Sequence, residues 1–596
     1  MAKIVPSTIR GGATSGERKL FNIFRDELPD DVIVYYEPFI YGRTPDYVLI
    51  IPSLGILILE VKDYRISSIE EGSNPEQWII FSNGVRVTVK NPLTQARDYS
   101  FLVCNKLKRD PFLVQGGDRS GNLKFPYAFG VVFTNITREE YLDSDMCEII
   151  DDNKAIFKDD LEEEDLFEII TSMFGRWPWF NGITEEEVER IRFNMFPEIR
   201  VTKQRGYDEN KLLSLKTLRT MDLYQESLAK NIGEGHRLIR GVAGSGKTLI
   251  LIARARLLSK KYKESKILIL CYSVTLAANI FNLINDEEEY PNIEVLTFNE
   301  FLYKAFRVRN VERIPQLLDG INSGKIKVPK YDHILLDETQ DFEDSWLKVI
   351  VSCLSEEHMS LLMVEDKAQD IFKRKTSLAS ATGLDFRGRA RILSINYRNP
   401  RYIASLAWQF HRKFLDRKES DIISPKFTDR LGHKPIIKKF DTFWGEVKWV
   451  CGEINKLIHS GVKLSDIAIL YRVRKTNQID YIATLSVGLN KANLAFRWVS
   501  ENRESKASYD FRENRVSLLT LDSSKGLDFK YVFIINADNI PFPLQDDIKR
   551  EASLMYIGLT RATEALYITY SSESVFTQYL ESLLESNMTT MNYFKG

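Results

Sequence analysis

The feature that most constrains this chain is a glycine-rich segment, residues 241–248, that matches the pattern GxxxxGK(S/T). An apolar strand-like run, Leu238–Arg240, precedes it and a helical stretch follows it, which is the context that a phosphate-binding loop requires. Glycines let the backbone wrap around phosphate oxygens, and the N–H groups at the start of the helix favour the anion. We therefore expect a nucleotide site that contains Gly241, Gly244, Ser245, Gly246, Lys247 and Thr248.

Within this loop, Lys247 would reach the β- and γ-phosphates and Thr248 would ligate Mg²⁺. A second apolar run, beginning at Ile334, ends in Asp337-Glu338. In such a pair the Asp holds Mg²⁺ and the Glu acts as general base toward the attacking water. An acidic pair after an apolar run is a weak signal alone, because surface strands often end in acidic residues. Downstream of a complete phosphate-binding loop it predicts nucleotide hydrolysis.

From about residue 210 onward, short apolar runs alternate with helical stretches. Strands that are apolar throughout and are separated by helices are typical of parallel sheets covered on both faces. The expected strands are Leu238–Arg240, Ile267–Tyr272, Ile334–Asp337, Ser360–Glu365, Arg391–Ile395, Ile467–Tyr471, Val516–Leu521 and Tyr531–Asn536.

The first 200 residues have a different pattern, which predicts a separate mixed α/β unit. Helices are expected at Glu17–Leu28 and Pro92–Lys108. The expected strands are Val32–Glu37, Asp46–Ile51, Gly55–Lys62, Gln77–Phe81, Val85–Val89 and Tyr127–Thr134.

Length and composition agree with several intracellular domains. A chain of 596 residues is too long for one hydrophobic core, since single cores stop growing near about 250–300 residues. The net charge of −1 excludes a basic tail but not a local basic groove. Five scattered cysteines without metal-binding spacing suit a reducing cytosol. Because neither a signal peptide nor a membrane span is present in the sequence, we expect a soluble cytoplasmic protein with no membrane partner.

The N-terminal block contains a candidate metal site. Asp46 stands at a strand start, and an apolar strand carries Glu60 and Lys62 at alternate positions, so both side chains lie on one face. A neighbouring strand can bring Asp46 beside them, where two carboxylates can hold Mg²⁺ and Lys62 can activate water. This is the pattern of metal-dependent nucleases. The bare pattern is common, however, and on its own it would more often be an exposed ion pair.

From the phosphate-binding loop onward, the chain resembles the UvrD/Rep/PcrA-like superfamily 1 helicases. The family motifs occur in order as DETQD at 337–341, EDKAQDIF at 365–372, NYR at 396–398, TLDSSKGLDF at 520–529 and YIGLTRA at 556–562. The resemblance implies two RecA-like lobes that flank ATP. It also implies movement in the 3′→5′ direction on single-stranded DNA.

This resemblance gives individual residues roles around ATP. Gln225 would read the adenine, Tyr397 would stack on it, and Asp528 would bond to the ribose. At the γ-phosphate, Glu338 would be the general base and Gln369 the sensor. The two arginine fingers would be Arg398 and Arg561. The guanidinium fork of each arginine can bind phosphate with two hydrogen bonds.

The chain departs from the helicase pattern at several positions. Asp522 stands where the family has His, and Asp528 stands where it has Glu. Arg374 occupies the place of the tryptophan that stacks on a base, and the short interval between Arg398 and motif V leaves little room for the 2B subdomain. Tyr272 lies where the family has an aromatic contact to DNA, with ordinary strand packing as an equal alternative.

Two further features join the metal-site pattern. Ser15-Gly16-Glu17 opens an amphipathic helix, and Asn91-Pro92 opens a later one that carries Gln95 and Tyr99 one turn apart. The block resembles the NERD (nuclease-related) domain, which implies a restriction-endonuclease-like α/β fold and Mg²⁺-dependent cleavage, with Mn²⁺ as a substitute. The resemblance makes Asp46, Glu60, Lys62 and Gln95 catalytic, and it makes Glu17, Asp46 and Glu60 the metal ligands.

The expected domain order follows from these motifs. Residues 1–200 would form the nuclease-like domain with a helical extension, and residues 201–215 the linker. Residues 216–395 would form lobe 1 (RecA-like 1A with a small 1B insertion), and residues 396–596 lobe 2 (RecA-like 2A with a reduced 2B). The predicted fold class is α/β throughout.

The functional hypothesis is an ATP-dependent DNA helicase or translocase coupled to a Mg²⁺-dependent DNA nuclease. Its partner would be single-stranded DNA or a duplex with a single-stranded region, and its role anti-phage defence or DNA repair. The alternative is a nucleotide-gated nucleic-acid-binding switch with a non-cleaving N-terminal module, which Asp522, Arg374 and the reduced 2B region favour. An RNA-directed role is compatible with the same residues.

Overall fold

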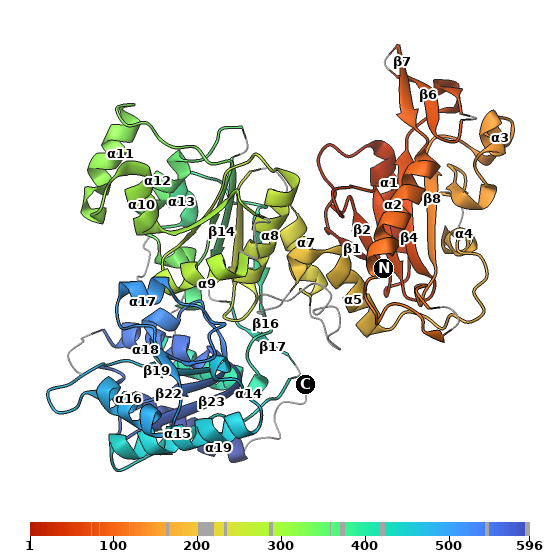
Figure 1. Ribbon diagram of the computed structural model, residues 1–596. Coiled ribbons are helices and arrows are strands. Elements are labelled where there is room, and N and C mark those ends of the chain that lie inside the picture. The colour runs from red at the N-terminus through yellow and green to blue at the C-terminus, as the bar shows by residue number, and fades with distance from the viewer. Residues whose placement is uncertain are drawn as a thin grey trace. The chain divides into compact units, whose positions relative to one another are not determined.

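The computed structural model describes residues 1–589 except 73, 83, 118–119, 163–165, 201–219, 232–234, 285–289, 358, 370–375, 416–422, 429 and 543–546. The chain divides into two compact units (Figure 1): Met1–Gly233 with Arg256–Lys261, and Glu234–Ala255 with Tyr262–Gly596. The expected linker at 201–215 and the departure at Arg374 lie outside the described residues. The predicted α/β fold class is confirmed in both units.

The first unit is built on a six-stranded mixed sheet with the order β1-β2-β3-β4-β8-β9. Strands β2, β3 and β4 are antiparallel neighbours, whereas β4 and β8 run parallel. The central strands are buried along almost their whole length, as a sheet covered on both faces requires. The strands are β1 (Lys3–Val5), β2 (Ile33–Tyr36), β3 (Tyr47–Ile51), β4 (Gly55–Lys62), β8 (Tyr127–Phe133) and β9 (Ala155–Ile156).

Side-chain caps fix the starts of the two helices that carry motif residues. Helix α1 (Ser15–Glu27) begins after Thr14, which forms a capping box with Glu17. Helix α2 (Pro92–Leu107) begins after Asn91, whose side chain accepts two backbone N–H groups of the first turn. The remaining helices of this unit are α3 (Arg138–Leu142), α4 (Leu166–Ser172), α5 (Glu185–Met195) and α7 (Leu223–Lys230).

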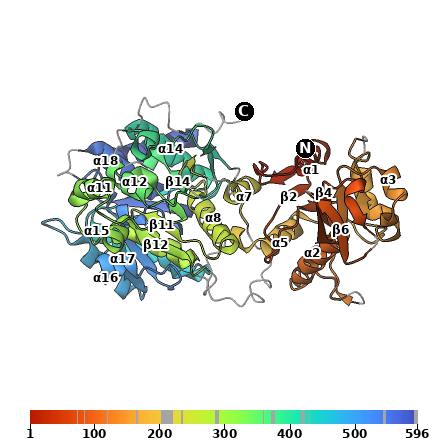
Figure 2. The same ribbon diagram turned by 90° about the horizontal axis from the view of Figure 1, so that it is seen from above.

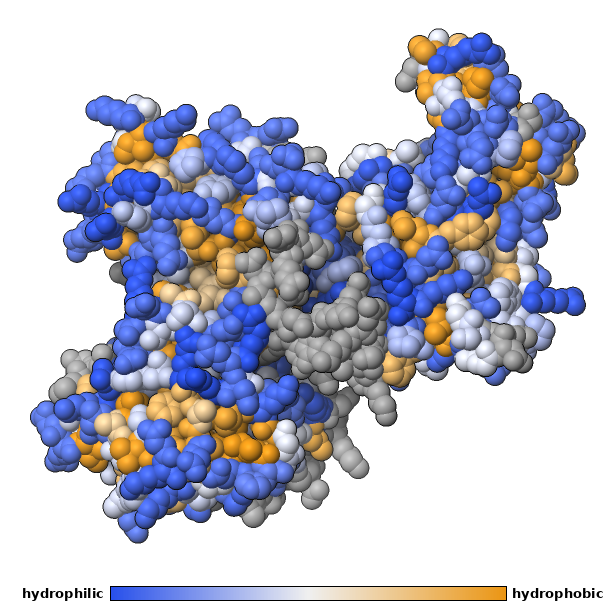
Figure 3. Space-filling view, in the orientation of Figure 1, coloured by the Kyte–Doolittle hydropathy of each residue, from blue (hydrophilic) through white to orange (hydrophobic). Residues whose placement is uncertain are grey.

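A small three-stranded sheet, β5 (Ile69–Glu71), β6 (Gln77–Ser82) and β7 (Val85–Lys90), extends from this unit. Its β6–β7 hairpin projects beyond the main sheet (Figure 1). Apolar side chains gather on the projection in Figure 3, where Phe81, Val85 and Val87 are all exposed.

Helix α7 belongs to the first unit, although the sequence analysis assigned residues 216–395 to lobe 1. The fully buried Glu226 of α7 forms ion pairs of 2.7 Å with Arg192 of α5 and with Lys230. Its carboxylate also accepts a hydrogen bond from Tyr35 of β2 at 3.2 Å. This buried charge cluster fixes α7, and with it Gln225, to the nuclease-like unit.

The second unit contains two parallel sheets, which we call lobe 1 and lobe 2. The lobe 1 sheet has the order β12-β11-β13-β14-β10-β15, and all of its described pairings are parallel. Its strands are β10 (Arg237–Gly241), β11 (Ile267–Cys271), β12 (Ile293–Thr297), β13 (His333–Leu336), β14 (Ser360–Glu365) and β15 (Ala390–Leu393).

Helices cover both faces of the lobe 1 sheet, as parallel connections require. Helices α8 and α12 flank β14 from opposite sides in Figure 1, and the view from above in Figure 2 agrees. These helices are α8 (Lys247–Lys261), α9 (Val274–Ile284), α10 (Phe298–Phe306), α11 (Ile314–Asn322), α12 (Asp344–Ser352) and α13 (Leu378–Thr382). The motif residues follow the carboxyl ends of β10, β13 and β14, where open α/β sheets bind ligands.

The lobe 2 sheet has the order β18-β23-β22-β19-β21-β20 and is also parallel. Its strands are β18 (Ile436–Lys439), β19 (Ile467–Tyr471), β20 (Phe496–Trp498), β21 (Val516–Thr520), β22 (Phe529–Ile534) and β23 (Ala562–Tyr570). Its helices are α14 (Arg401–Leu415), α15 (Phe443–His459), α16 (Tyr481–Lys491), α17 (Arg503–Ala507), α18 (Ile548–Leu559) and α19 (Val575–Thr589). A short parallel pair, β16 (Ile395–Asn396) and β17 (Lys426–Phe427), accompanies the sheets.

Candidate active site

The phosphate-binding loop lies between β10 and α8. Gly244 and Gly246 adopt positive φ angles of 73° and 84°, which glycine reaches without steric cost. A side chain at position 244 would collide with Asn396 and Arg398. The backbone N–H of Tyr397 also donates to the Gly244 carbonyl at 3.0 Å. The glycine loop therefore leaves room for the NYR segment that the sequence placed around ATP.

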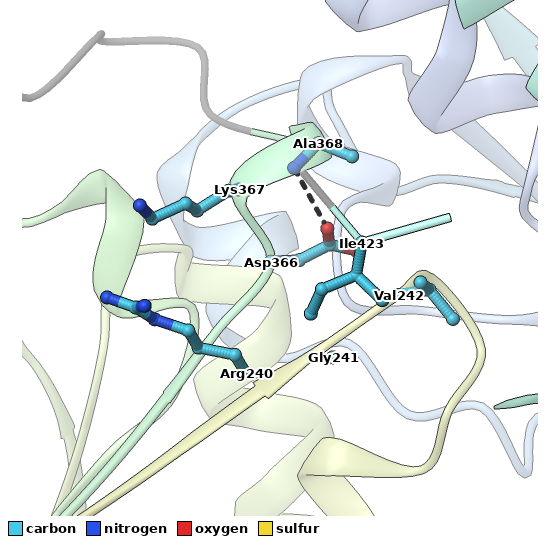
Figure 4. Close-up of a pocket in the computed structure, with 7 residues that line it drawn as sticks. All are labelled: Arg240, Gly241, Val242, Asp366, Lys367, Ala368 and Ile423. Atoms are coloured by element: carbon cyan, nitrogen blue, oxygen red, sulfur yellow. Dashed lines mark hydrogen bonds between the residues drawn. The ribbon is translucent and has the colours of Figure 1, made fainter. Parts of the chain in front are cut away.

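The Lys247 ammonium is buried and folded back onto the loop. Its Nζ donates to the carbonyls of Gly241 and Val242 at 3.0 and 2.9 Å, and it lies 3.4 Å from Asp366 Oδ2. The other Asp366 oxygen accepts a hydrogen bond from the Ala368 N–H at 3.0 Å. A pocket beside the loop (Figure 4) is lined by Arg240, Gly241, Val242, Asp366, Lys367, Ala368 and Ile423. A phosphate entering here can replace Asp366 as the partner of Lys247.

Thr248 and Asp337 meet beside the loop, where a divalent ion is expected. The Thr248 hydroxyl donates to Asp337 Oδ2 at 2.8 Å. Burial and the neighbouring Glu338 raise the pKa of Asp337 to about 7. A bound cation would reverse this effect, because it favours the charged carboxylate. Against the effect of burial, Lys525 and Lys247 hold the pKa of Glu338 below its usual value, so this base is ionised.

A chain of polar contacts connects lobe 2 with the loop. Arg561, between α18 and β23, is buried, and its Nη2 donates to Gln369 Oε1 at 3.3 Å. Gln369 Nε2 in turn donates to Asp366 Oδ2 at 3.0 Å. Burial and the nearby Arg398 lower the pKa of Arg561 to about 9. The structure thus brings the expected sensor and both expected arginine fingers together.

The expected nucleoside-binding residues are only partly brought together. Arg398 Nε lies 4.0 Å from Asp528 Oδ2, and Tyr397, which directly precedes Arg398, is 39% exposed. Gln225 lies on α7 in the first unit, where its backbone N–H donates to Asp222 Oδ1 at 3.1 Å. Its role toward adenine stays a prediction.

Two positions that the sequence connected with DNA have defined surroundings. Tyr272 is 40% exposed and stacks on Trp346, with ring centroids 6.1 Å apart. It therefore has a packed face and an accessible edge, so both interpretations stay open. Asp522 Oδ1 lies 3.7 Å from Arg550 Nη2. Sequence reasoning missed Arg550, because the two residues are far apart in the chain.

A second site lies at the ends of β3 and β4 in the first unit. Asp46 Oδ2 accepts a hydrogen bond from the Val61 N–H at 2.7 Å and lies 3.8 Å from Lys62 Nζ. Lys62 Nζ donates to Glu60 Oε2 at 3.0 Å. Burial and the charge of Asp46 raise the pKa of Glu60 to about 7. The predicted trio of Asp46, Glu60 and Lys62 is therefore assembled by the antiparallel pairing of β3 with β4.

Helix α2 adds a fourth residue, Gln95, to this site. Gln95 Nε2 donates to Glu60 Oε2 at 2.8 Å and contacts the Tyr99 hydroxyl at 3.2 Å. Glu60 Oε1 is buried without a hydrogen-bond partner, and such an acceptor costs about 1–3 kcal/mol. A cation held by Asp46 and Glu60 would satisfy this oxygen. In the described parts of the chain, no group of three or more Asp, Glu, His or Cys could hold a metal, so water and phosphate oxygens would supply the other ligands.

Glu17, which the resemblance placed among the metal ligands, takes part in the cap of α1, and its metal role stays a prediction. Its Oε2 accepts the Thr14 N–H at 2.9 Å and the Tyr36 hydroxyl at 3.2 Å, so the carboxylate serves as a helix cap. The preceding Gly16 N–H donates instead to Asp63 at 3.1 Å, and the Thr134 hydroxyl also bonds to Asp63. Sequence reasoning missed Asp63, although it directly follows the EVK segment.

Comparison with protein families finds matches in both units, and the match to the AAA domain begins within α7. A model of the nuclease-related domain matches residues 13–132, and a model of the AAA domain matches residues 225–374. A model of the UvrD-like helicase C-terminal domain matches residues 392–503 and 499–573. The chain joins a nuclease-related domain to a UvrD-like helicase region.

Curated relatives match the UvrD-like helicase region in part. ATP-dependent DNA helicase PcrA of Bacillus subtilis (strain 168) is 26% identical over 200 residues, which cover 33% of this chain and 25% of the relative. ATP-dependent DNA helicase Rep of Buchnera aphidicola subsp. Schizaphis graminum is 43% identical over 76 residues, 12% of this chain and 11% of the relative. A probable DNA helicase of Mycoplasma pneumoniae is 22% identical over 261 residues, 42% and 45% of the two chains.

The chain therefore spans less than half the length of each of these relatives. Within the described residues, every helix is too short or too polar to cross a membrane.

Proposed function

We propose that the chain is an ATP-driven motor on DNA whose nuclease-related domain cleaves DNA with Mg²⁺, or with Mn²⁺ in its place. Movement would be 3′→5′ on a single strand, with unwinding of an attached duplex. The observation that supports the motor is the contact of Arg561 of lobe 2 with Gln369 of lobe 1 at 3.3 Å, because Gln369 is the residue expected to sense the γ-phosphate. Anti-phage defence and DNA repair both fit this pairing of activities.

The residues of the second unit suit phosphoryl transfer, which depends on positioning and charge neutralisation. Lys247 would hold the β- and γ-phosphates, and Arg398 and Arg561 would approach from the lobe 2 side. Glu338, which Lys525 and Lys247 keep ionised, would accept the proton of the attacking water. Because these groups come from two lobes, hydrolysis would alternately tighten and release the lobe contact, and such a closure can step along a strand.

ATP hydrolysis with and without DNA tests the motor. We expect single-stranded DNA to stimulate the wild type, and we expect Lys247→Ala to abolish hydrolysis under both conditions. The exposed Lys263→Ala is the matched control, because Lys263 lies beyond the end of α8. An ATPase that DNA leaves unchanged would argue against a motor. If RNA stimulates ATP hydrolysis more strongly than DNA does, the motor acts on RNA.

The nuclease site supports cleavage of a phosphodiester. Asp46 and Glu60 would hold Mg²⁺, which when bound withdraws charge from the scissile phosphate. Lys62 would orient the attacking water and stabilise the added negative charge. Gln95 donates to Glu60 Oε2, so the buried Oε1, which has no hydrogen-bond partner, would be the oxygen left to bind the ion.

Incubation of linear and circular DNA with Mg²⁺, with and without ATP, tests cleavage. We expect the wild type to degrade DNA and Lys62→Ala to leave it intact while keeping its ATPase activity. Lys90→Ala, an exposed lysine of β7 paired with Asp98, is the matched control. If the DNA stays intact with both the wild type and Lys62→Ala under every condition, the nuclease hypothesis is wrong.

One observation favours a second candidate, a nucleotide-gated DNA-binding switch with a non-cleaving nuclease-related domain. Among the described residues, no group of three acidic, histidine or cysteine ligands assembles at Asp46 and Glu60. In such a switch, ATP would change DNA affinity without cleavage or directional movement. A DNA affinity that differs between the ATP-bound and ADP-bound protein would support this switch, provided that the wild type neither cleaves nor translocates.

A further inference from the structure

An arginine cluster lies at the end of the lobe 1 sheet opposite the phosphate-binding loop. Arg237 begins β10, whereas the loop follows Gly241 at its other end. The edge strand β15 pairs with β10 so that Leu238 is opposite Ala390, which sets Arg389 level with Arg237. Arg391 lies two residues further along β15, on the same face as Arg389. We call Arg237, Arg389 and Arg391 the arginine edge.

Contacts around the arginine edge hold Arg389 in place. The Leu238 N–H donates to the Arg389 carbonyl at 3.2 Å. Gly235 has a φ of 86°, and a Cβ there would lie 2.6 Å from Arg389 Nη1, so the missing side chain makes room for this guanidinium. Arg254 of α8 lies close enough for the charge of Arg237 to act on it.

The positive charge of this edge is not balanced within the described residues. No ion pair is found there for Arg237, Arg389 or Arg391, whereas Arg387 is paired with Asp385 at 2.7 Å. The Arg237 Nε is buried and has no hydrogen-bond partner. Burial, followed by the charges of Arg389 and Arg391, lowers the pKa of Arg237. Burial and Arg237 lower the pKa of Arg254 to about 10. An anionic ligand would relieve this repulsion.

We propose that the arginine edge binds the phosphodiester backbone of DNA, as a contact separate from the nucleotide site. Guanidinium groups bind phosphate oxygens with two parallel hydrogen bonds, and they are the preferred cations for this task. Positions two apart on a strand are separated by about 6.7 Å, so Arg389 and Arg391 can each meet a different phosphate of one strand. Both side chains are exposed, and an exposed strand edge suits an extended polymer.

Nucleic acid fits this edge better than an acidic protein does. The described edge offers repeated cations, and the exposed apolar residue Ile392 directly follows Arg391. A backbone of evenly spaced charges needs no further recognition, because phosphate contacts position a nucleic acid without reading its sequence. The inference does not depend on ATP hydrolysis, so it can fail or succeed independently of the motor.

The test is the salt dependence of DNA binding by the full chain. Fluorescence anisotropy of labelled single-stranded and duplex DNA of equal length would be measured over a series of KCl concentrations. For Arg389→Gln/Arg391→Gln we expect weaker binding of at least one DNA form. The slope of log Kd against log salt should fall by about 1 for each arginine removed. The form whose slope changes is the form that the edge binds.

Arg387→Gln is the matched control, because Arg387 is exposed in the same segment but already paired with Asp385. It should retain the wild-type slope, and ATP hydrolysis without DNA should be unchanged in both variants, which shows that the lobe is folded. A double variant with wild-type slope on both DNA forms would overturn the proposal. So would an equal loss in Arg387→Gln, or competition by polyglutamate as effective as competition by unlabelled DNA.

Discussion

Lys525 of lobe 2 donates to both carboxylate oxygens of Asp341 in lobe 1, at 2.8 and 2.6 Å, and both side chains are buried. Lys525 Nζ also donates to the Gln369 carbonyl at 3.0 Å. One ammonium group thus connects the segment after β13 with the segment that carries the expected γ-phosphate sensor. Because its two partners lie on different lobes, this ion pair must break when the lobes separate at this point.

Removing one partner of this pair should be costly. We expect Lys525→Met to lower the free energy of unfolding by about 3–5 kcal/mol, because Asp341 is left as an unpaired buried charge. Lys525→Met/Asp341→Leu should lose much less than the sum of the two single variants. Denaturant unfolding of the four proteins gives the coupling energy. Additive losses would mean that the two charges do not act as a pair.

The arginine at position 561 should act on hydrolysis rather than on ATP binding. Its guanidinium reaches Gln369 at 3.3 Å, and a lysine is too short and lacks the fork. We expect Arg561→Lys to lower the rate of ATP hydrolysis by about 10³-fold or more, with little change in ATP affinity. Arg550→Lys is the control, because Arg550 lies on α18, shortly before Arg561, and pairs with Asp522 rather than with Gln369. Lost ATP binding in Arg561→Lys would point to a structural role.

Gln95 should set the metal requirement of cleavage, because it orients Glu60 through the 2.8 Å hydrogen bond. We expect Gln95→Ala to raise the Mg²⁺ concentration for half-maximal cleavage by about 10- to 100-fold, with partial recovery at high Mg²⁺. Arg97→Ala, at a half-buried position two residues along α2, should behave like the wild type. A lower maximal rate at an unchanged Mg²⁺ requirement would contradict this positioning role.

Glu446 of α15 should make the stability of lobe 2 depend on pH. Burial raises its pKa to about 7, although the Asn536 N–H donates to it at 3.1 Å and Ser571 also bonds to it. Because the folded chain holds this proton more tightly than the unfolded chain, the contribution is full below about pH 4 and is lost as the pH rises toward 7.

We therefore expect the wild-type Tm to fall more steeply than that of Glu446→Gln between about pH 5 and 7. The contribution can reach about 3 kcal/mol. Scanning calorimetry at several pH values measures it, with Glu453→Gln on the same helix as control. Parallel curves for the wild type and Glu446→Gln would show that the carboxyl group does not titrate in this range.

Much of the fold could be predicted, since buried strands have unmistakable sequences. The prediction of a strand at Gly55–Lys62 matches β4, and the helix predicted at Pro92–Lys108 matches α2 to one residue. Strands such as β12, with its partly exposed residues, and β23, with interspersed polar residues, were not predicted. Their strand conformation depends on neighbours in the sheet, which local pattern does not contain.

The candidate sites divide in the same way. Residues on one loop or strand, such as Lys247 with Thr248 and Glu60 with Lys62, could be grouped from spacing alone. The capping role of Glu17 and the pairing of Lys525 with Asp341 could not, because hydrogen bonds between distant segments decide them. The same holds for α7, whose buried Glu226 binds it to the nuclease-like unit rather than to lobe 1.

Arrival times at a DNA end measure whether ATP hydrolysis drives movement along DNA. Oligonucleotides of increasing length would carry a dye at the 5′ or the 3′ end, and dye fluorescence would be followed by stopped flow after ATP addition. We expect a delay at the 5′ end that grows in proportion to length, and no such delay for Lys247→Ala. A signal independent of length at both ends would contradict the motor and support the nucleotide-gated switch.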